Sequence, residues 1–351
     1  MIIYLILIFL LILLYIFFKN DRKKFCIFSG ILFFLLVALR SVEIGISDTK
    51  NVYYPMFLKM QEYSFSEIFF NSNLSGEVFF AITKILGIFI SNYQIYLAII
   101  GIPYIFCVFY FINKHSKHIL LSTIIFLSLY YLYSFFLLRQ VIAMGILLLS
   151  YDFLKEKKPI KFVITVLIAT LFHQTAFVFL FAYPFCIFNK FGKKNYVYIV
   201  VFYVLANILP QFIFFLIKTF DFSGNLLNYV KHGIYDTSGS VSMFGLLITV
   251  IMLVFANFYK KKFDYESDLV YNLSTIGSVL FSLSGVVSEF YRLSLFFSIF
   301  NIILIPNVIE NEKNKTRKCI FIFGIALISI LYFLIRSINN IHANPYVFFW
   351  R

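Results

Sequence analysis

Residues 1–40 read MIIYLILIFLLILLYIFFKNDRKKFCIFSGILFFLLVALR, and this stretch decides the fold class. Two apolar runs flank the polar break KNDRKK at 19–24. A run of about 20 apolar residues is long enough to cross the hydrocarbon core of a bilayer. The first run has no positive charge before it and no small-residue cleavage site after it, so we expect a retained span and not a signal peptide.

The composition extends this pattern to the whole chain. The 351 residues are 62% hydrophobic and only 13% charged, whereas a soluble domain carries about 25% charged residues. Short alternating strands of the kind that build a transmembrane barrel do not appear. The sequence therefore predicts an all-α polytopic membrane protein, organised as a single integral membrane domain over residues 1–351.

Charge and cysteine usage exclude several other classes. The net charge is +14, which fits the enrichment of Lys and Arg in cytoplasmic loops of membrane proteins, and the chain carries no nucleic-acid-binding motif. Cys26, Cys107, Cys186 and Cys319 are scattered without any CxxC, so neither a metal site nor a disulfide framework is indicated. We expect no nucleic acid partner and no cofactor.

The apolar segments predict about 12 transmembrane helices. They lie at roughly 1–18, 25–39, 94–113, 119–137, 140–154, 160–173, 174–189, 195–217, 241–259, 268–286, 291–309 and 319–337. A weaker segment lies at 76–90 and is not counted as a full crossing. Residues 40–93 then form an outer loop with a short or re-entrant helix, and residues 218–240 form a second outer loop.

Lysine-rich breaks set the orientation. They are KNDRKK at 19–24, NKHSK at 113–117, KEKKPIK at 155–161, NKFGKK at 189–194, YKKK at 259–262 and NEKNKTRK at 311–318. Placing all six in the cytoplasm gives both termini an outside position and puts 18 of 23 lysines inside. Five of the seven arginines then lie outside, so arginine on that face is expected to serve another purpose.

This topology gathers polar residues on the outer face. They are Arg40, Glu43, Asp48, Tyr53, Glu77, Arg139, Gln140, His173, Gln174, Glu289, Arg292, Arg336 and the C-terminal NPYVFFW. Ionisable residues at membrane depth are costly and usually functional. Because the arginine fork matches phosphate oxygens, the cluster indicates an anionic, phosphate-bearing substrate.

Structural alternatives accompany several of these residues. Arg40 could anchor a span end by snorkelling, and Asp48 with Thr49 could cap a short helix. Glu289 and Arg292 are three residues apart and could simply pair with each other. Arg139 could belong to a structural ion pair, and His173 could be satisfied inside a helical turn.

Four ordered stretches resemble one known family. RSVEIGISDTKNVYYPMF at 40–57 resembles the Arg–x–Gly–x–Asp–Thr–x–x–Tyr stretch of EpsG-type, Wzy-like polysaccharide polymerases. Gly76-Glu77-Val78-Phe79, LLRQVIAMGILLLS at 137–150 and LFHQTAF at 171–177 follow in the family's order, with NPYVFF near the C-terminus. Here two residues separate Gly45 from Asp48 where one is commoner, and Val78 stands where Pro is common.

The resemblance implies a membrane glycosyltransferase of GT-C-like, lipid-phosphate-dependent type. Such an enzyme polymerises undecaprenyl diphosphate-linked oligosaccharide repeat units at the outer face of the bacterial cytoplasmic (inner) membrane, facing the periplasm or exterior. The product would be O-antigen, capsule or exopolysaccharide. Its partners would be the lipid-linked oligosaccharide, membrane lipid, a flippase and a chain-length regulator.

Site roles follow from this chemistry. Fixed arginines can stabilise a leaving diphosphate without a metal, so we assign Arg40, Arg139 and Arg292 to that group and expect metal independence. The acceptor hydroxyl needs a base, for which His173, Asp48 and Glu77 are the candidates. The remaining substrate-binding candidates are Gln140, Tyr53, Glu289 and Tyr346, and Tyr53 and Tyr346 are placed to stack on sugar rings.

Three other functions remain open from the sequence. A flippase for the same lipid-linked oligosaccharide would use buried arginines too, although such transporters show internal repeats that are not evident here. A membrane acyltransferase would use His173 as its base and would not need Asp48. A ligase that transfers finished polymer shares the chemistry and differs only in its acceptor.

Overall fold

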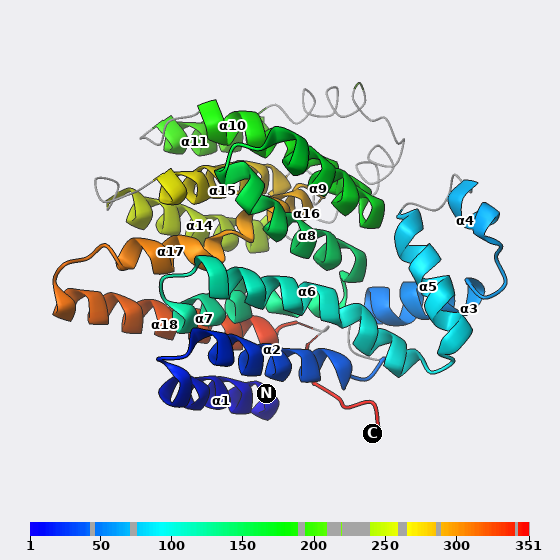
Figure 1. Ribbon diagram of the computed structural model, residues 1–351. Coiled ribbons are helices and arrows are strands. Elements are labelled where there is room, and N and C mark those ends of the chain that lie inside the picture. The colour runs from blue at the N-terminus through cyan, green and yellow to red at the C-terminus, as the bar shows by residue number, and fades with distance from the viewer. Residues whose placement is uncertain are drawn as a thin grey trace. The chain divides into compact units, whose positions relative to one another are not determined.

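The computed structural model of the chain describes residues 1–42, 46–70, 76–188, 194–208, 219, 239–258, 265–285, 289–340 and 343–350. Within these ranges every regular element is a helix (Figure 1). The one strand-like pairing among them is a bridge between Arg40 and Phe348. The all-α prediction is therefore confirmed for the described part. Glu43, Gly45 and nearly all of the predicted outer loop 218–240 lie outside it.

The chain forms two compact units. Unit 1 comprises Met1–Phe177 and Glu312–Arg351, and unit 2 comprises Val178–Asn311. The helices of unit 1 are α1 (Ile2–Phe18), α2 (Arg22–Ala38), α3 (Tyr54–Lys59), α4 (Phe65–Phe70), α5 (Glu77–Phe89), α6 (Tyr93–His115), α7 (Ile119–Leu129), α8 (Leu138–Lys155), α9 (Pro159–Phe172) and α18 (Lys315–Ile338). A wide π-type turn covers Ile46–Tyr53, and a 3₁₀ segment covers Tyr131–Phe135.

All regular elements in the described part of unit 2 are helices. Its elements are α10 (Ala182–Phe188), α11 (Lys194–Ile208), α14 (Gly239–Phe258), α15 (Tyr265–Ser282), α16 (Glu289–Ser298) and α17 (Asn301–Ile309), with a 3₁₀ segment at Gln174–Phe181 that begins in unit 1. Asn195 donates to the side chains of Asn272 (3.2 Å) and Thr275 (3.0 Å), and this buried polar contact joins α11 to α15.

Length and composition identify the clearest membrane spans. Two described helices qualify, α6 and α18, and the bent pair α16 and α17 would make a third across its 42° break. Several shorter apolar helices accompany them, α1, α7 and α9 among them. The chain is thus a helical membrane protein whose described residues include two to three clear apolar spans, and the number of about 12 stays a prediction.

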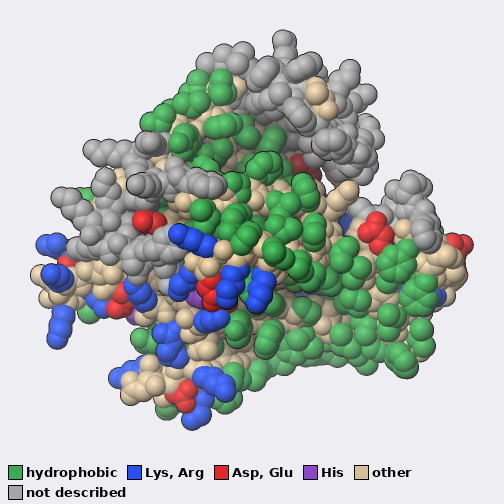
Figure 2. Space-filling view, turned by 45° about the horizontal axis from the view of Figure 1, so that its top comes forward, with side chains coloured by type: hydrophobic (Ala, Val, Ile, Leu, Met, Phe, Trp, Pro, Cys, Tyr) green, Lys and Arg blue, Asp and Glu red, His purple; other side chains and the backbone are tan. Residues whose placement is uncertain are grey.

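The lysine-rich linkers of unit 1 meet at one end, which we call the lysine end. It comprises residues 19–24, 113–118, 155–161 and 312–318. Arg22 donates to the carbonyls of Asn113 (2.6 Å) and Ser116 (2.7 Å), so the α1–α2 and α6–α7 linkers touch. Figure 2 shows Lys and Arg side chains gathered beside a broad hydrophobic surface, as a membrane-embedded helical unit requires.

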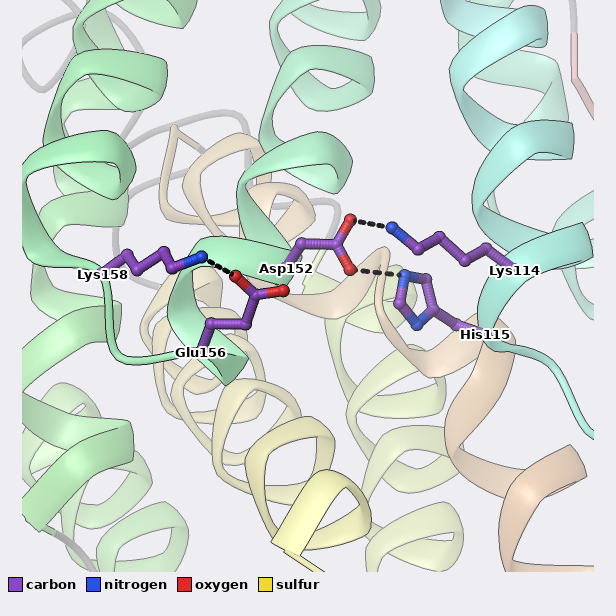
Figure 3. A network of polar contacts seen from close by, with 5 residues as sticks. All are labelled: Lys114, His115, Asp152, Glu156 and Lys158. Atoms are coloured by element: carbon purple, nitrogen blue, oxygen red, sulfur yellow. Dashed lines mark hydrogen bonds and ion pairs between the residues drawn. The ribbon is translucent and has the colours of Figure 1, made fainter.

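A polar network fastens α6 to α8 at the lysine end. Asp152 of α8 accepts from Lys114 (2.7 Å) and faces His115 Nε2 (3.2 Å), and both partners come from the last turn of α6 (Figure 3). His115 is buried between Phe111 and Tyr151. Beside this network, Glu156 pairs with Lys158 at 2.5 Å, and both side chains are half exposed.

The opposite end of unit 1, which we call the arginine end, is built from irregular segments. It comprises residues 39–42, 46–53, 130–139, 172–174 and 343–350 together with Gly76 and Asn92. Here α2 and α7 end and α6 and α8 begin. The N-cap of α5 is Gly76, which lies against the Phe172 carbonyl of this end. The last residue of α5 is three positions before Asn92, the N-cap of α6. Both termini of α5 therefore lead back to the arginine end.

The predicted segment 119–137 is interrupted. α7 stops at Leu129, and Tyr131–Phe135 continues as a 3₁₀ segment before α8 begins at Leu138. Arg336 donates to the carbonyls of Ser128 (3.1 Å) and Leu129 (2.7 Å) and lies 4.7 Å from the Tyr133 ring centroid. Terminal carbonyls of a helix need partners and favour cations, so Arg336 stabilises this helix end.

We expect Asp152→Asn to loosen the α6–α8 contact at the lysine end. The amide cannot offer a carboxylate to both Lys114 and the buried His115, and losing one charge-assisted hydrogen bond costs about 1–2 kcal/mol. The melting temperature of the purified protein should fall by roughly 2–6 °C. Glu156→Gln is the matched control because it removes an exposed pair, and equal melting temperatures for the two variants would contradict the role given to Asp152.

The two ends of unit 1 should face opposite sides of the membrane. In a background in which the exposed Cys319 is replaced by Ser, we would introduce Cys at Asn20 of the lysine end or at Ser91 of the arginine end, both exposed. A membrane-impermeant maleimide should label Ser91→Cys in intact cells and Asn20→Cys only after permeabilisation. The reverse labelling pattern would show that the protein has the opposite orientation in the membrane.

Candidate functional site

Arg40 is the most deeply buried charged side chain of the described residues. It has no exposed surface, donates from Nη1 to the Val37 carbonyl (2.6 Å) and lies 5.5 Å from the Phe135 ring centroid. Its Nε and Nη2 find no hydrogen-bond partner within the described part of the chain. Burial lowers the pKa of Arg40 to about 10, so the guanidinium remains charged at neutral pH.

The C-terminal segment covers Arg40. Ser41 donates to the Val347 carbonyl (2.8 Å), and Phe349 donates to the Leu39 carbonyl (3.0 Å). The Tyr346 hydroxyl donates to the Leu36 carbonyl (2.8 Å), and its ring packs edge-on against Tyr4 and Phe348. The structure thus uses Tyr346 to hold this cover in place, and sugar stacking by Tyr346 stays a prediction.

The turn at Ile46–Tyr53 carries Asp48 and Tyr53. Thr49 fixes it by donating to the Phe135 carbonyl (2.7 Å), and Tyr93 donates to the Thr49 carbonyl (3.1 Å). Tyr53 is buried against Phe79. Burial raises the pKa of the Tyr53 phenol, and the nearby Arg139 opposes that shift while Asp48 adds to it. Arg139, Tyr53 and Asp48 therefore lie within electrostatic reach of one another.

Arg139 stands in the first turn of α8, directly after the irregular segment 130–137. Its guanidinium lies 5.4 Å from the Phe80 ring centroid, and its backbone N–H faces the Tyr53 hydroxyl at 3.5 Å. A cation at the N-terminus of a helix is unfavourable with respect to the helix dipole, so the position is not explained by helix stability. Gln140 follows it and is buried.

Gly76 brings the remaining candidates together. It adopts φ +88°, and a Cβ at this position would lie 2.7 Å from the Phe172 carbonyl oxygen and 3.4 Å from Arg139 Nη1. Glu77 follows Gly76 and His173 follows Phe172, so both flank this contact. His173 has extended backbone where α9 ends. Arg139, Glu77 and His173 thus converge from α8, α5 and α9.

The three candidate bases differ in their surroundings. Asp48 and His173 each take part in polar or electrostatic contacts. Glu77 is half-buried and makes no hydrogen bond or ion pair to any residue that the structure describes. Glu77 follows Gly76, which lies close to Arg139 Nη1. A carboxylate without a hydrogen-bond or ion-pair partner is available to accept a proton.

Glu289 and Arg292 belong to unit 2. They open α16 and face each other at 3.8 Å from Oε2 to Nη1, with 41% of Arg292 exposed. The i,i+3 pairing anticipated from their spacing is present. Their assignment to substrate stays a prediction.

Several residues that shape this end are not evident from the sequence. Three side chains donate hydrogen bonds to distant backbone carbonyls. Tyr93 donates to the carbonyl of Thr49, Gln94 to that of Arg40 (2.9 Å) and Tyr131 to that of Phe33 (2.9 Å). Such partners lie tens of residues apart in the chain, and aromatic residues are so numerous here that none is conspicuous. Only the polar Gln94 in an apolar helix offered a signal.

No group of three or more His, Cys, Asp or Glu side chains in the described ranges is arranged to hold a metal ion. Metal independence stays a prediction.

Comparison with known proteins gives one result. The family model of the EpsG family matches residues 23–348, nearly the whole chain. No curated protein and no solved structure matched significantly. The matched range includes all ten residues assigned to catalysis or substrate from the sequence.

We expect Gly76→Ala to disturb this end of unit 1. A side chain at positive φ costs about 1–2 kcal/mol, and the new methyl group would also press on the Phe172 carbonyl. The melting temperature should fall by at least roughly 3 °C. Gly324→Ala in α18 is the control because nothing lies within 4 Å of its Cβ position. If both variants melt alike, the close contact at Gly76 is not what holds α5 to α9.

Proposed function

The chain belongs to the EpsG family, and on that premise we propose that it polymerises undecaprenyl diphosphate-linked oligosaccharide repeat units. The family is associated with polysaccharide polymerisation by glycosyl transfer. The observation that best supports this activity is the convergence at Gly76, where Arg139 Nη1 lies close to the residue that precedes Glu77, and the half-buried Glu77 carboxylate is unpaired among the described residues.

The reaction moves the growing chain from its lipid carrier to a new repeat unit. The bond between the anomeric carbon and the diphosphate oxygen breaks, and the lipid diphosphate leaves with the electron pair. A hydroxyl of the incoming repeat unit forms the new glycosidic bond and gives its proton to a base. Preorganised cations stabilise the charge that grows on the diphosphate in a site that excludes water.

Arg139 and Arg40 carry the diphosphate in this proposal, and the sequence adds Arg292 of unit 2 as a third candidate ligand. Two buried nitrogens of Arg40 have no hydrogen-bond partner in the described part of the chain, which supports this role. Leaving a buried neutral group without a hydrogen bond costs about 1–3 kcal/mol, and a charged group costs more. A bound anion would remove that cost. Gln140, Tyr53, Glu289 and Tyr346 complete the substrate-binding set.

Glu77 is the proposed base, in preference to Asp48 and His173. It lies one residue from the Gly76 contact with Arg139, and its carboxylate is not committed elsewhere among the described residues. Asp48 and His173 then position the sugar and the 46–53 turn. The active site faces the exterior or periplasm, on the side opposite the lysine end, in a GT-C-like arrangement of about 12 spans. A flippase supplies the substrate, and a chain-length regulator sets the product.

We expect a strain that lacks this chain to lose its ladder of surface polysaccharide and to display single repeat units. Wild-type protein should restore the ladder. Arg139→Ala should fail to restore it because the leaving diphosphate loses its cation, and Glu77→Gln should fail because the acceptor hydroxyl keeps its proton. Gel analysis of surface polysaccharide, with membrane levels of each variant measured by immunoblot, checks both.

Arg317→Ala is the control for charge. Arg317 lies at the lysine end and its nearest acidic partner, Glu312, is 3.7 Å away, so this variant should restore a normal ladder. A ladder that persists in the deletion strain would refute the polymerase. Repeat units held on the inner leaflet would indicate a flippase, and long chains left on the carrier would indicate a ligase. A ladder restored by Glu77→Gln would return the role of base to Asp48 or His173.

A further inference from the structure

A groove runs between α2 and α6 on the surface of unit 1. Its cavity volume is about 410 Å³, and its walls are almost entirely apolar. Gly30 lines the groove, and a Cβ there would lie at ordinary contact distance, 3.4 Å, from the Phe109 ring. Ile27 and Phe106 form the sides and are 50% and 64% exposed.

The groove matches one leaflet of a bilayer in length. It extends along α2 from Lys23 to Phe34, which is roughly 16 Å at 1.5 Å per residue. Half of a hydrocarbon core of about 30 Å is about 15 Å. The groove starts at the lysine end, so an extended hydrocarbon chain lying in it would belong to the leaflet on that side.

A cation stands at the polar mouth of the groove. Lys23 lines it together with Tyr110 and Asn113. The neighbouring basic residues are occupied, since Arg22 donates to the carbonyls of Asn113 and Ser116 and Lys24 pairs with Asp21 at 3.0 Å. The ammonium of Lys23 makes no ion pair or hydrogen bond to any residue that the structure describes. Basic pockets between membrane helices on the cytoplasmic side suit anionic lipid headgroups.

We propose that the α2–α6 groove binds an anionic phospholipid of the lysine-side leaflet, with one acyl chain between the helices and the phosphate at Lys23. The apolar length selects a lipid over a free phosphate, and the unpaired ammonium selects an anionic headgroup over a zwitterionic one. The bound lipid lies along Gly30 and contacts both α2 and α6. This site lies at the end of unit 1 opposite Arg40 and Arg139 and does not depend on the proposed polymerase activity.

Native mass spectrometry of the full chain tests the proposal. Protein purified in mild detergent is incubated with an equimolar mixture of dioleoyl phosphatidylglycerol and dioleoyl phosphatidylcholine. One lysine near a headgroup contributes about 1 kcal/mol, so we expect phosphatidylglycerol to be retained about fivefold over phosphatidylcholine. Lys23→Gln should remove that preference, and Ile27→Trp, which fills the groove, should remove the retained lipid altogether.

Lys24→Gln is the matched control and should keep the full preference, since Lys24 is already paired with Asp21. Added inorganic phosphate should not displace the lipid. Any of four results would overturn the proposal. The wild type could retain the two lipids equally, or the preference could survive Lys23→Gln. Phosphate could displace the lipid, or a polyprenyl phosphate could be retained in place of the phospholipid.

Discussion

The arginine end of unit 1 depends on side chains that satisfy backbone carbonyls where the helices stop. A helix leaves its last four carbonyls without internal partners, and near a membrane core such groups cost several kcal/mol each when nothing satisfies them. Arg40 serves the end of α2, and Arg336 serves the end of α7. Thr49 and Tyr346 reach the carbonyls of Phe135 and Leu36. These bonds satisfy the irregular backbone of the arginine end, and the polar candidate residues of this end are attached to that backbone.

The same constraint explains why the site is formed by helix ends and not by helix faces. The regular parts of α2, α6 and α8 pack closely; a Cβ at Gly101 would lie 2.6 Å from Val37, and one at Gly145 would lie 3.2 Å from Cys107. At these two positions the close contacts leave no room for a substrate between the helices. Around Gly76, the start of α5, the start of α8 and the end of α9 approach one another instead. Each of these helix ends carries one polar candidate residue: Glu77, Arg139 or His173. Glycine at positive φ makes this approach possible, because any larger residue would strike the Phe172 carbonyl.

The helical class could be predicted from the sequence because an apolar run and a lysine-rich break are local signals. The same signals predict that most arginines of unit 1 lie at the end opposite the lysines, and the contacts of Arg22 with Asn113 and of Gln94 with Arg40 agree with that arrangement. The stop of α7 at Leu129 could not be foreseen, because the residue that caps it, Arg336, lies 207 positions away along the chain. For the same reason the bond from the Tyr346 hydroxyl to the Leu36 carbonyl, 310 positions away along the chain, could not be foreseen.

Lysine and arginine have different roles in unit 1, because the ammonium and guanidinium groups differ in chemistry. At the lysine end, ammonium groups meet carboxylates in partly exposed pairs, such as Lys114 with Asp152 and Lys24 with Asp21, which hold linkers together at modest energy. At the arginine end, Arg40 is wholly buried, donates to a carbonyl and has two further nitrogens without a partner among the described residues. A lysine could not do this, because a buried ammonium loses its proton more readily than a guanidinium does. A permanent charge kept in such a place is consistent with an anion that arrives from outside the protein.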